Sequence, residues 1–323
     1  MDSATRNFLG LVGISATLAA YVVCGAIAYV LVPFLGLRPE TLARIGPACL
    51  LPAIVLVAMI GISAGAALRT LVRQVSASRR LSRRVRAQGL SAPPELFAAA
   101  QAAGLDGRVW MVDSGEQFSF VHGFFVPRVA ISRGFLESLT AEELRAALEH
   151  ERYHVRHLDP LRALLGKTLV EAFFLLPSLE VLRIRYEAGR ELAADRHAEQ
   201  VCGRRSLLGA LLKAMEGPGR ELAVSASLAD PGFLDARISR LETGQAPALA
   251  SADIRSLFTS ALGAASFLLL FITAVVGLGG RSALARVVAD ELSTGGALLG
   301  ALCVAPIVVV GGLAYWLLSR QAR

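Results

Sequence analysis

The residues of this chain best suited to chemistry lie in the run His150-Glu151-Arg152-Tyr153-His154. Positions four residues apart share one face of a helix, so both imidazoles can point at a single metal ion. Glu151 can then reach a water molecule beside that ion and act as a general base. This H-E-x-x-H pattern predicts half of a zinc hydrolase site, with His150 and His154 as metal ligands and Glu151 as the catalytic residue.

A zinc site with two histidines needs a third protein ligand, and Glu191 is the best candidate further along the chain. In the helix predicted for residues 185–201, Glu191 and Asp195 lie one turn apart on a face with small residues, whereas Arg190 is expected to point elsewhere. We therefore predict Glu191 as the third zinc ligand. Asp195 is predicted to accept a hydrogen bond from a histidine N–H behind the metal.

Each of these assignments has a simpler alternative. Glu187, one helical turn before Glu191, is a rival metal ligand. Asp195 is also placed to form a salt bridge with Arg190 or Arg196. The H-E-x-x-H run alone occurs by chance in charged helices, but its combination with an E-x-x-x-D spacing favours zinc.

The helix that carries the H-E-x-x-H run has clear ends. Thr140 and Glu143 form the capping-box pattern at its start, and Pro160 lies beyond its end. Its apolar stripe consists of Leu144, Leu148, Val155 and Leu158, and its opposite face is expected to lie in water with Arg145, Glu149, Arg152 and Arg156. Glu151 falls within the apolar stripe. Because burying an unpaired carboxylate is costly, a metal site with its water gives Glu151 a reason to be there.

Upstream of this helix, the sequence predicts a short helix from Glu95 and three strands at residues 108–113, 117–121 and 128–132. We expect the last strand to provide an edge on which an extended substrate adds as a further strand. The substrate-binding residues predicted there are Arg128, Ala130 and Ser132. Tyr186 and Arg237 are candidates for stabilising an oxyanion.

The composition predicts membrane spans, because 54% of the residues are hydrophobic and only 18% are charged, with a mean hydropathy of +0.55. A bilayer core needs about 20 apolar residues of helix. Four uncharged runs meet that length, at residues 8–37, 45–68, 257–280 and 295–318. We predict two transmembrane helices in residues 1–71, a zinc metallopeptidase domain in 72–254, and two transmembrane helices in 255–323. The apolar part of residues 161–182 is too short and too often interrupted by charges to span the bilayer. We therefore predict a core or membrane-surface helix there, broken at Pro177.

A cluster of arginines indicates the orientation. Directly after the second run, and without any acidic residue among them, come Arg69, Arg73, Arg79, Arg80, Arg83, Arg84 and Arg86. Such an excess marks the cytoplasmic side, so the catalytic domain is expected in the cytoplasm and the protein in the inner (plasma) membrane. Most of the net charge of +7 comes from this cluster. Membrane lipids explain it better than nucleic acid, which we do not expect as a direct partner. The four cysteines show no C-x-x-C spacing, which argues against a thiolate zinc site.

The stretch from about Phe118 to Ala198 resembles the integral-membrane zinc peptidases of the BlaR/MecR antirepressor type. The matching segments are Pro127 to Gly134, Glu142 to Leu148, the H-E-x-x-H run, Asp159-Pro160, Phe173 to Pro177 and the Arg190-Glu191-x-x-Ala194-Asp195 segment. The resemblance implies an α-helical membrane protein with an α+β, gluzincin-like (zincin) metallopeptidase domain. It also implies Zn²⁺ on His150, His154 and Glu191, Glu151 as the base, and a protein or peptide substrate, with a transcriptional repressor as one candidate.

Two comparisons limit this resemblance. The HtpX and CAAX-prenyl-protease type shares both motifs, but HtpX-like members place two spans between them, and the 36 residues from Val155 to Arg190 cannot hold two. Antibiotic-sensing relatives carry an extracellular penicillin-binding domain after the last span, whereas five residues follow Leu318, so we do not expect β-lactam sensing by that route. Three functions remain open: a regulatory peptidase, a quality-control or processing peptidase, and a non-catalytic signalling scaffold. The intact H-E-x-x-H run favours an enzyme.

Overall fold

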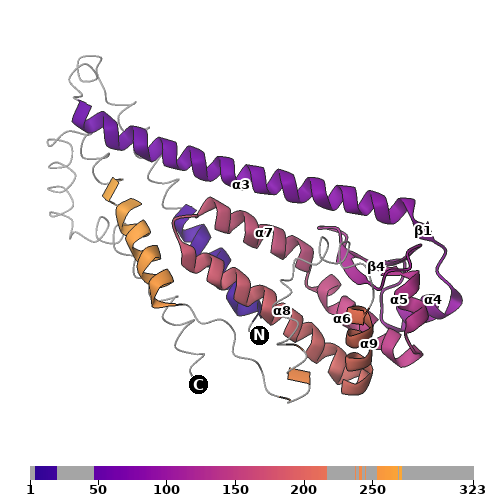
Figure 1. The fold of residues 1–323 in the computed structure, drawn as a ribbon. Helices are drawn as coiled ribbons and strands as arrows, with labels where there is room; N and C mark the ends of the chain where they lie inside the picture. Colours follow the sequence, from indigo (N-terminus) through magenta and orange to yellow (C-terminus); the bar gives the residue numbers. More distant parts are fainter. Residues whose placement is uncertain are drawn as a thin grey trace, which may run out of the picture. The chain divides into compact units, whose positions relative to one another are not determined.

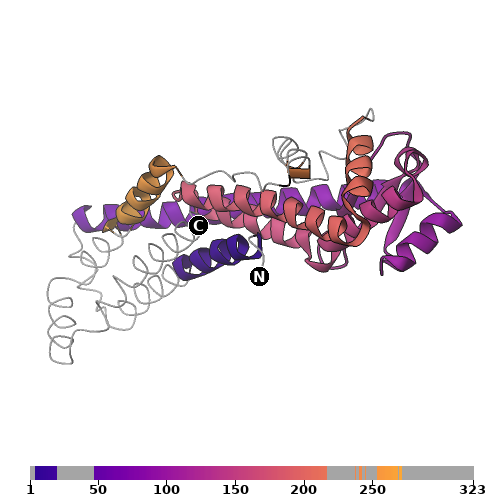
Figure 2. The same ribbon diagram turned by 90° about the horizontal axis from the view of Figure 1, so that it is seen from below.

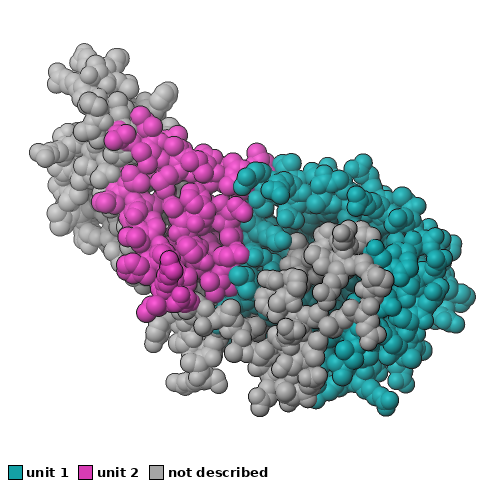
Figure 3. Space-filling model, in the orientation of Figure 1, with its two compact units in different colours: residues 1–8, 69–168, 183–251 teal, residues 9–68, 169–182, 252–323 magenta. Residues whose placement is uncertain are grey.

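The computed structural model describes residues 4–19, 47–216, 237, 240–241, 244, 253–267 and 269–270. The chain divides into two compact units (Figure 3). Unit 1 contains residues 1–8, 69–168 and 183–251, and unit 2 contains residues 9–68, 169–182 and 252–323. All the candidate site residues named above lie in unit 1.

A small sheet forms one part of unit 1 (Figure 1). Its strands are β1 (Gly89–Leu90), β2 (Val109–Val112), β3 (Ser119–His122) and β4 (Arg128–Ser132), in the spatial order β1-β2-β4-β3. The β2 and β4 strands are parallel, and the other two pairs are antiparallel. The three predicted strands are therefore confirmed, whereas the two-residue β1 was not predicted.

The strand order corrects one prediction about the substrate. Because β4 pairs with β2 on one side and β3 on the other, the main chain of Arg128, Ala130 and Ser132 has no free edge to offer. The prediction that this strand binds an added substrate strand is wrong. The free edge beside β4 belongs to β3 within the described sheet.

The described residues also form helices before, between and after these strands in the chain. They are α3 (Pro47–Ala87), α4 (Pro94–Ala102), α5 (Arg133–Ser138), α6 (Ala141–Arg156), α7 (Asp159–Ala172), α8 (Pro177–Cys202) and α9 (Arg204–Glu216). Residues 4–19 and 254–267 are also helical. Both ribbon views show α3 and α8 as uninterrupted helices (Figures 1 and 2). The predicted break at Pro177 is confirmed, because α7 ends at Ala172 and α8 begins at Pro177.

Alternation along the strands gives the sheet two apolar faces. One face packs against α3, in a cluster of Leu81, Val85, Trp110, Val112, Phe118, Phe120 and Ala130. The other face packs against α4 and α6, in a cluster that includes Leu96, Met111, Val129, Ile131, Leu144, Leu148 and Val155. Successive strand residues point to opposite faces, which is why Ala130 belongs to the first cluster and its neighbours to the second. The sheet is thus held between α3 and the helix that carries the histidines.

The capping box of α6 forms as predicted. The Thr140 hydroxyl accepts a hydrogen bond from the Glu143 backbone at 3.3 Å, and the Glu143 carboxylate accepts one from the Thr140 backbone at 2.7 Å. The polar face of α6 differs from the prediction, since Glu149 is only 3% exposed. It accepts hydrogen bonds from Arg152 on its own helix and is paired with His197 of α8. A helical-wheel argument could not include that second helix.

One stretch among the described residues is long and apolar enough to cross a bilayer. It is Ile54–Ala87, whose most apolar window has a mean hydropathy of 2.0 and is 6% buried. The predicted run 45–68 overlaps it. The predicted runs 8–37 and 257–280 are described only in part, as helix at 4–19 and 254–267, and the run 295–318 lies outside the described residues. The described structure therefore contains one candidate span, and the predicted total of four stays a prediction.

Candidate metal centre

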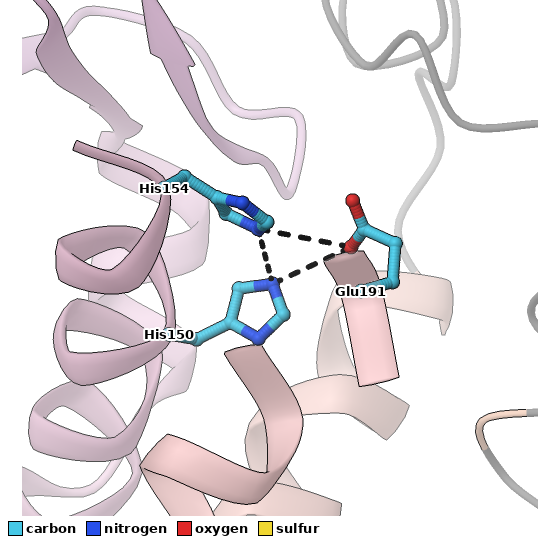
Figure 4. Close-up of side chains that lie close together, drawn as sticks. All are labelled: His150, His154 and Glu191. Atoms are coloured by element: carbon cyan, nitrogen blue, oxygen red, sulfur yellow. Dashed lines mark hydrogen bonds and ion pairs between the residues drawn. The ribbon is translucent and has the colours of Figure 1, made fainter. Parts of the chain in front are cut away.

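The side chains of His150 and His154 on α6 and Glu191 on α8 converge on one point (Figure 4). The Nε2 atoms of the two histidines are 3.1 Å apart. Glu191 Oε2 lies 3.6 Å from the Nε2 atom of His150 and 3.8 Å from that of His154. Glu191 and His154 are buried and His150 is nearly so.

These distances fit a zinc ion. Tetrahedral zinc has bonds of about 2.0–2.1 Å to nitrogen and oxygen, which places its ligand atoms about 3.3–3.4 Å from one another. The three measured separations bracket that value. Two imidazoles and one carboxylate are also a donor set found in catalytic zinc sites, where a fourth position stays open. The residues present therefore suit zinc without large movement of α6 or α8.

A carboxylate lies behind each histidine ring. Asp159 Oδ2 is 2.6 Å from Nδ1 of His154, and Asp195 Oδ1 is 3.0 Å from Nδ1 of His150. The second contact has the length of an ion pair, but it is less well aligned as a hydrogen bond. With Nδ1 protonated toward a carboxylate, each ring is held so that Nε2 presents its lone pair to the metal position. Asp195 lies where the acceptor was predicted.

Glu191 is held by two arginines. Arg190 donates to Oε1 of Glu191 at 2.9 Å from Nη2 and 3.2 Å from Nε. Arg237 binds Asp195 through two hydrogen bonds of 2.8 Å, and its Nη1 lies 3.5 Å from Glu191 Oε2. The prediction that Arg190 points away from the site is wrong, because this residue is buried against Glu191. The salt-bridge partner of Asp195 is Arg237 rather than Arg190 or Arg196.

Glu187, the rival ligand, is occupied elsewhere. It accepts a hydrogen bond of 2.6 Å from Arg183 and is 2% exposed. Burial raises the pKa of its carboxyl group, an effect that Arg183 and Arg190 partly offset. In the described structure Glu191, one turn after Glu187 on α8, is therefore the carboxylate that groups with the two histidines.

The charges around the metal position favour a cation. Burial opposes ionisation of Glu191, but His154 and Arg190 outweigh it and hold the pKa of Glu191 well below its usual range. Burial likewise lowers the pKa of His150, but its contacts with Asp195 and Glu191 prevail and raise that pKa to about 9. A site that attracts a proton this strongly also attracts a metal ion, which must displace the proton in order to bind.

A cavity of about 190 Å³ opens beside the metal position. Its polar wall includes Glu151 and Arg237, and a second wall comes from Ser119, Phe120 and Val121 of the edge strand β3. The remaining wall is apolar and consists of Phe135, Ala147, Leu207, Ala210, Leu211 and Ala214. Glu151 lines the same cavity as the three candidate metal ligands.

The two oxyanion candidates occupy different places. Arg237 lines the cavity, whereas Tyr186 is 1% exposed and donates to Asp159 Oδ1 at 3.3 Å. Burial and the nearby Asp159 charge raise the pKa of Tyr186, so its hydroxyl remains a donor. Tyr186 thus supports the carboxylate behind His154 and does not line the cavity among the described residues.

A family model described as BlaR1 peptidase M56 matches residues 47–241, which is more than half of the chain. The chain belongs to the M56 peptidase family. The resemblance deduced from the motifs is thereby confirmed, and the protein is assigned to a class of membrane-associated peptidases. No solved structure matches the chain.

The M56 match includes Asp159 and Arg190, whose contacts in the site were not predicted. It also includes Arg237, which was predicted as an oxyanion candidate but not as the partner of Asp195. Asp159 follows His154 by five residues, directly after Leu158, whose positive φ of 52° turns the chain between α6 and α7. An aspartate at the start of the next helix was a detectable signal. No local pattern relates Arg237 to Asp195, which precedes it by 42 residues.

Proposed function

We propose that this M56 protein is an integral-membrane zinc endopeptidase whose active site faces the cytoplasm. The observation that carries the proposal is the triangle of two Nε2 atoms and one Oε2 atom, with a carboxylate behind each histidine. His150, His154 and Glu191 would hold the ion. When bound, zinc would polarise the scissile carbonyl and lower the pKa of a water molecule in its open position.

Glu151 serves as the base in this proposal. It lies on α6 between the two histidines, is 7% exposed and lines the cavity. A carboxylate in that position can take a proton from the attacking water and pass it to the leaving amine. Its neighbours in the sequence bind the metal, so the same helix positions both the ligands and the base.

Arg237 is the proposed electrostatic partner of the reacting carbonyl. Its Nε and Nη2 atoms are fixed by Asp195, which leaves Nη1 directed toward the region of Glu191 Oε2 and the cavity. A guanidinium held in this way needs no reorganisation when negative charge develops on the carbonyl oxygen. Arg237 also balances the buried carboxylates of Asp195 and Glu191.

The substrate is proposed to bind as an extended chain along β3. Main-chain groups of an edge strand can pair with an added strand, and residues 119–121 of β3 line the cavity. The apolar wall formed by α9 and α6 would then receive a side chain next to the scissile bond. This arrangement replaces β4, predicted from the sequence, as the substrate-binding strand.

The cytoplasmic orientation and the regulatory role also belong to the proposal. The arginines that follow the uncharged part of α3 support an inside location for unit 1. Membership in a family described by BlaR1 supports regulatory cleavage of a cytoplasmic protein, with a transcriptional repressor as the first candidate.

The experiment compares cells that contain the wild-type protein with cells that contain Glu151→Gln. Cytoplasmic and membrane fractions are analysed for new peptide termini, since the glutamine variant keeps the shape of the site but lacks the base. We expect termini that occur only with the wild-type protein and that map to a small number of substrates. Identical sets of termini in both strains would contradict the proposed peptidase function.

A further inference from the structure

The turn between β3 and β4 exposes large apolar side chains. Residues 124–126, Phe-Phe-Val, form the tip of this hairpin, and Phe125 is 81% exposed and Val126 is 62% exposed. Single exposed apolar residues are common on protein surfaces, but adjacent ones at the end of a projecting turn indicate a contact with an apolar partner.

The conformation of the turn holds these side chains outward. Gly123 has a φ of +90°, and a Cβ atom at that position would lie 2.9 Å from the Val126 carbonyl oxygen. Only glycine adopts this geometry without strain. At the other end of the turn, Pro127 is buried and fixes the return into β4. The hairpin tip is therefore a formed feature of unit 1.

The hairpin points toward the N-terminal end of the arginine segment of α3. The Arg86 guanidinium lies 5.5 Å from the ring centre of Trp110, which is level with Phe120 in the sheet register. One turn earlier on α3, the hydroxyl of Ser82 is 3.0 Å from Nδ1 of His122. From Arg86 to Ser82, toward the N-terminus of α3, the helix therefore passes from the level of Phe120 to that of His122. This is the direction in which β3 runs toward the hairpin tip.

This direction brings the tip close to the place where charge begins on α3. The chain turns at Gly123 and bends at residues 124–126, so the three residues from His122 to Phe125 extend at most about 10 Å. This length corresponds to about seven helical residues, and the tip reaches at most the level of about residue 75. Arg69, the first charged residue after the uncharged run, is then at least about 9 Å further along the helix axis. The headgroup layer of a bilayer is about 5–8 Å thick on each side, and a phenylalanine ring can reach into it.

We propose that the hairpin tip inserts its apolar side chains into the interfacial layer of the membrane. The inference rests on the proposed function to the extent that α3 crosses the bilayer. The same unit carries basic side chains, since Arg128 begins β4 and the arginines from Arg69 to Arg86 are exposed. An apolar tip on a unit with exposed basic groups matches the acyl boundary and anionic headgroups of a cytoplasmic leaflet.

The anchored hairpin has a consequence for the substrate. Its first strand, β3, is the edge strand that lines the cavity. Anchoring the tip holds this strand near the membrane surface, so that peptide bonds close to the membrane are presented to Glu151 more readily than bonds far from it. The inference therefore adds a class of substrate, namely proteins with a cleavable segment next to the bilayer.

The test measures lipid contact at three positions of the full chain. A background without the native cysteines Cys24, Cys49, Cys202 and Cys303 receives one cysteine, labelled with a bimane fluorophore, at Phe125, Phe97 or Val57. Phe97 on α4 is the matched control, since it is 58% exposed in the same unit. Val57 is 65% exposed in the uncharged part of α3 and reports whether α3 crosses the membrane. The proteins are reconstituted in phosphatidylethanolamine and phosphatidylglycerol vesicles that contain a lipid with a nitroxide on its acyl chain.

We expect the label at Phe125 to be quenched several-fold more strongly than the label at Phe97, and the label at Val57 to be quenched as well. Equal quenching at Phe125 and Phe97, with Val57 quenched, would overturn the hairpin inference and leave the span intact. No quenching at Val57 would instead refute α3 as a span. The Phe125 label could instead be shielded from solvent in detergent, to a degree that increases with protein concentration. That result would identify a second copy of the chain as the partner and would likewise overturn the inference.

Discussion

Replacing Asp159 by asparagine should weaken zinc binding while leaving the fold intact. Asp159 lies outside the metal ligand set, but its Oδ2 atom is 2.6 Å from Nδ1 of His154. Loss of such a partner typically lowers metal affinity by about 10–100-fold, or about 1.4–2.8 kcal/mol. Because asparagine keeps the shape and one acceptor, we expect about 10-fold for Asp159→Asn and about 100-fold for Asp159→Ala.

Asp159 is a cleaner position for this experiment than Asp195. Removal of Asp195 would leave Arg237 buried without its two hydrogen bonds, and breaking a buried ion pair typically costs about 3–5 kcal/mol of stability. Removal of Asp159 affects the neutral donor Tyr186 and a longer contact of 3.9 Å with Arg190, which keeps its two hydrogen bonds to Glu191. Tyr186→Phe should therefore give a small graded effect of less than about 1 kcal/mol on zinc affinity.

The assay is a competition for zinc between the purified protein and a chromophoric chelator, with thermal unfolding of the metal-free protein measured in parallel. Asp113→Asn is the matched control, because Asp113 is half exposed and pairs with Arg133 at the surface. The typical loss of zinc affinity on removal of such a partner is at least about tenfold. If the zinc affinity of Asp159→Asn stays within about twofold of the wild-type value, the argument that Asp159 orients His154 is refuted.

Three further predictions concern stability and specificity. Burial, followed by the charges of Arg128 and Arg86, lowers the pKa of His122 to about 4. Between about pH 4 and about pH 6.5, the unfolded chain therefore binds a proton at His122 that the folded chain does not bind. The free energy of unfolding includes the full contribution of His122 above about pH 6.5 and decreases by about 2 kcal/mol when the pH is lowered to about 5, and denaturant titrations of His122→Gln should not show this decrease. Gly134→Ala should lower the unfolding free energy by about 1–3 kcal/mol, since its Cβ would collide with the Gly115 carbonyl, whereas Gly115→Ala, which has open space, should not. Ala214→Phe should narrow the cavity at its apolar wall, so that cleavage of a peptide library shifts toward substrates with smaller side chains. An unchanged cleavage profile would show that Ala214 is not part of the substrate site.

Local patterns in the sequence predicted the elements that carry the site. The i, i+4 spacing of His150 and His154 and the capping box at Thr140 depend on a single helix, and both appear as expected. The three predicted strands also occur. These features follow from interactions between residues close together in the chain, which is why a single sequence contains them.

The failures have a common physical cause, because each depends on contacts between distant segments. The parallel pairing of β2 with β4 buries β4 inside the sheet and leaves β3 at the edge, and no periodicity within a strand reports its neighbours. Glu149 is buried because His197 of α8 supplies its partner. Arg237 reaches Asp195 only through the folding of unit 1. The E-x-x-x-D motif was enough to predict that Glu191 lies near the two histidines. The contacts of Arg190 and Arg237 with Glu191 could not be predicted from a local pattern.

The central claim is tested most directly by the zinc content of freshly purified protein, measured together with cleavage for the wild type, Glu151→Gln and Glu191→Gln. Glu142→Gln, an exposed position on α6, serves as the control. The wild type and Glu151→Gln should each hold about one zinc ion per chain, with cleavage by Glu151→Gln at least about 100-fold slower, whereas Glu191→Gln should lose the metal. Wild-type protein without zinc, or a Glu191→Gln variant that keeps both zinc and activity while Glu151→Gln loses its zinc, would contradict the assigned roles.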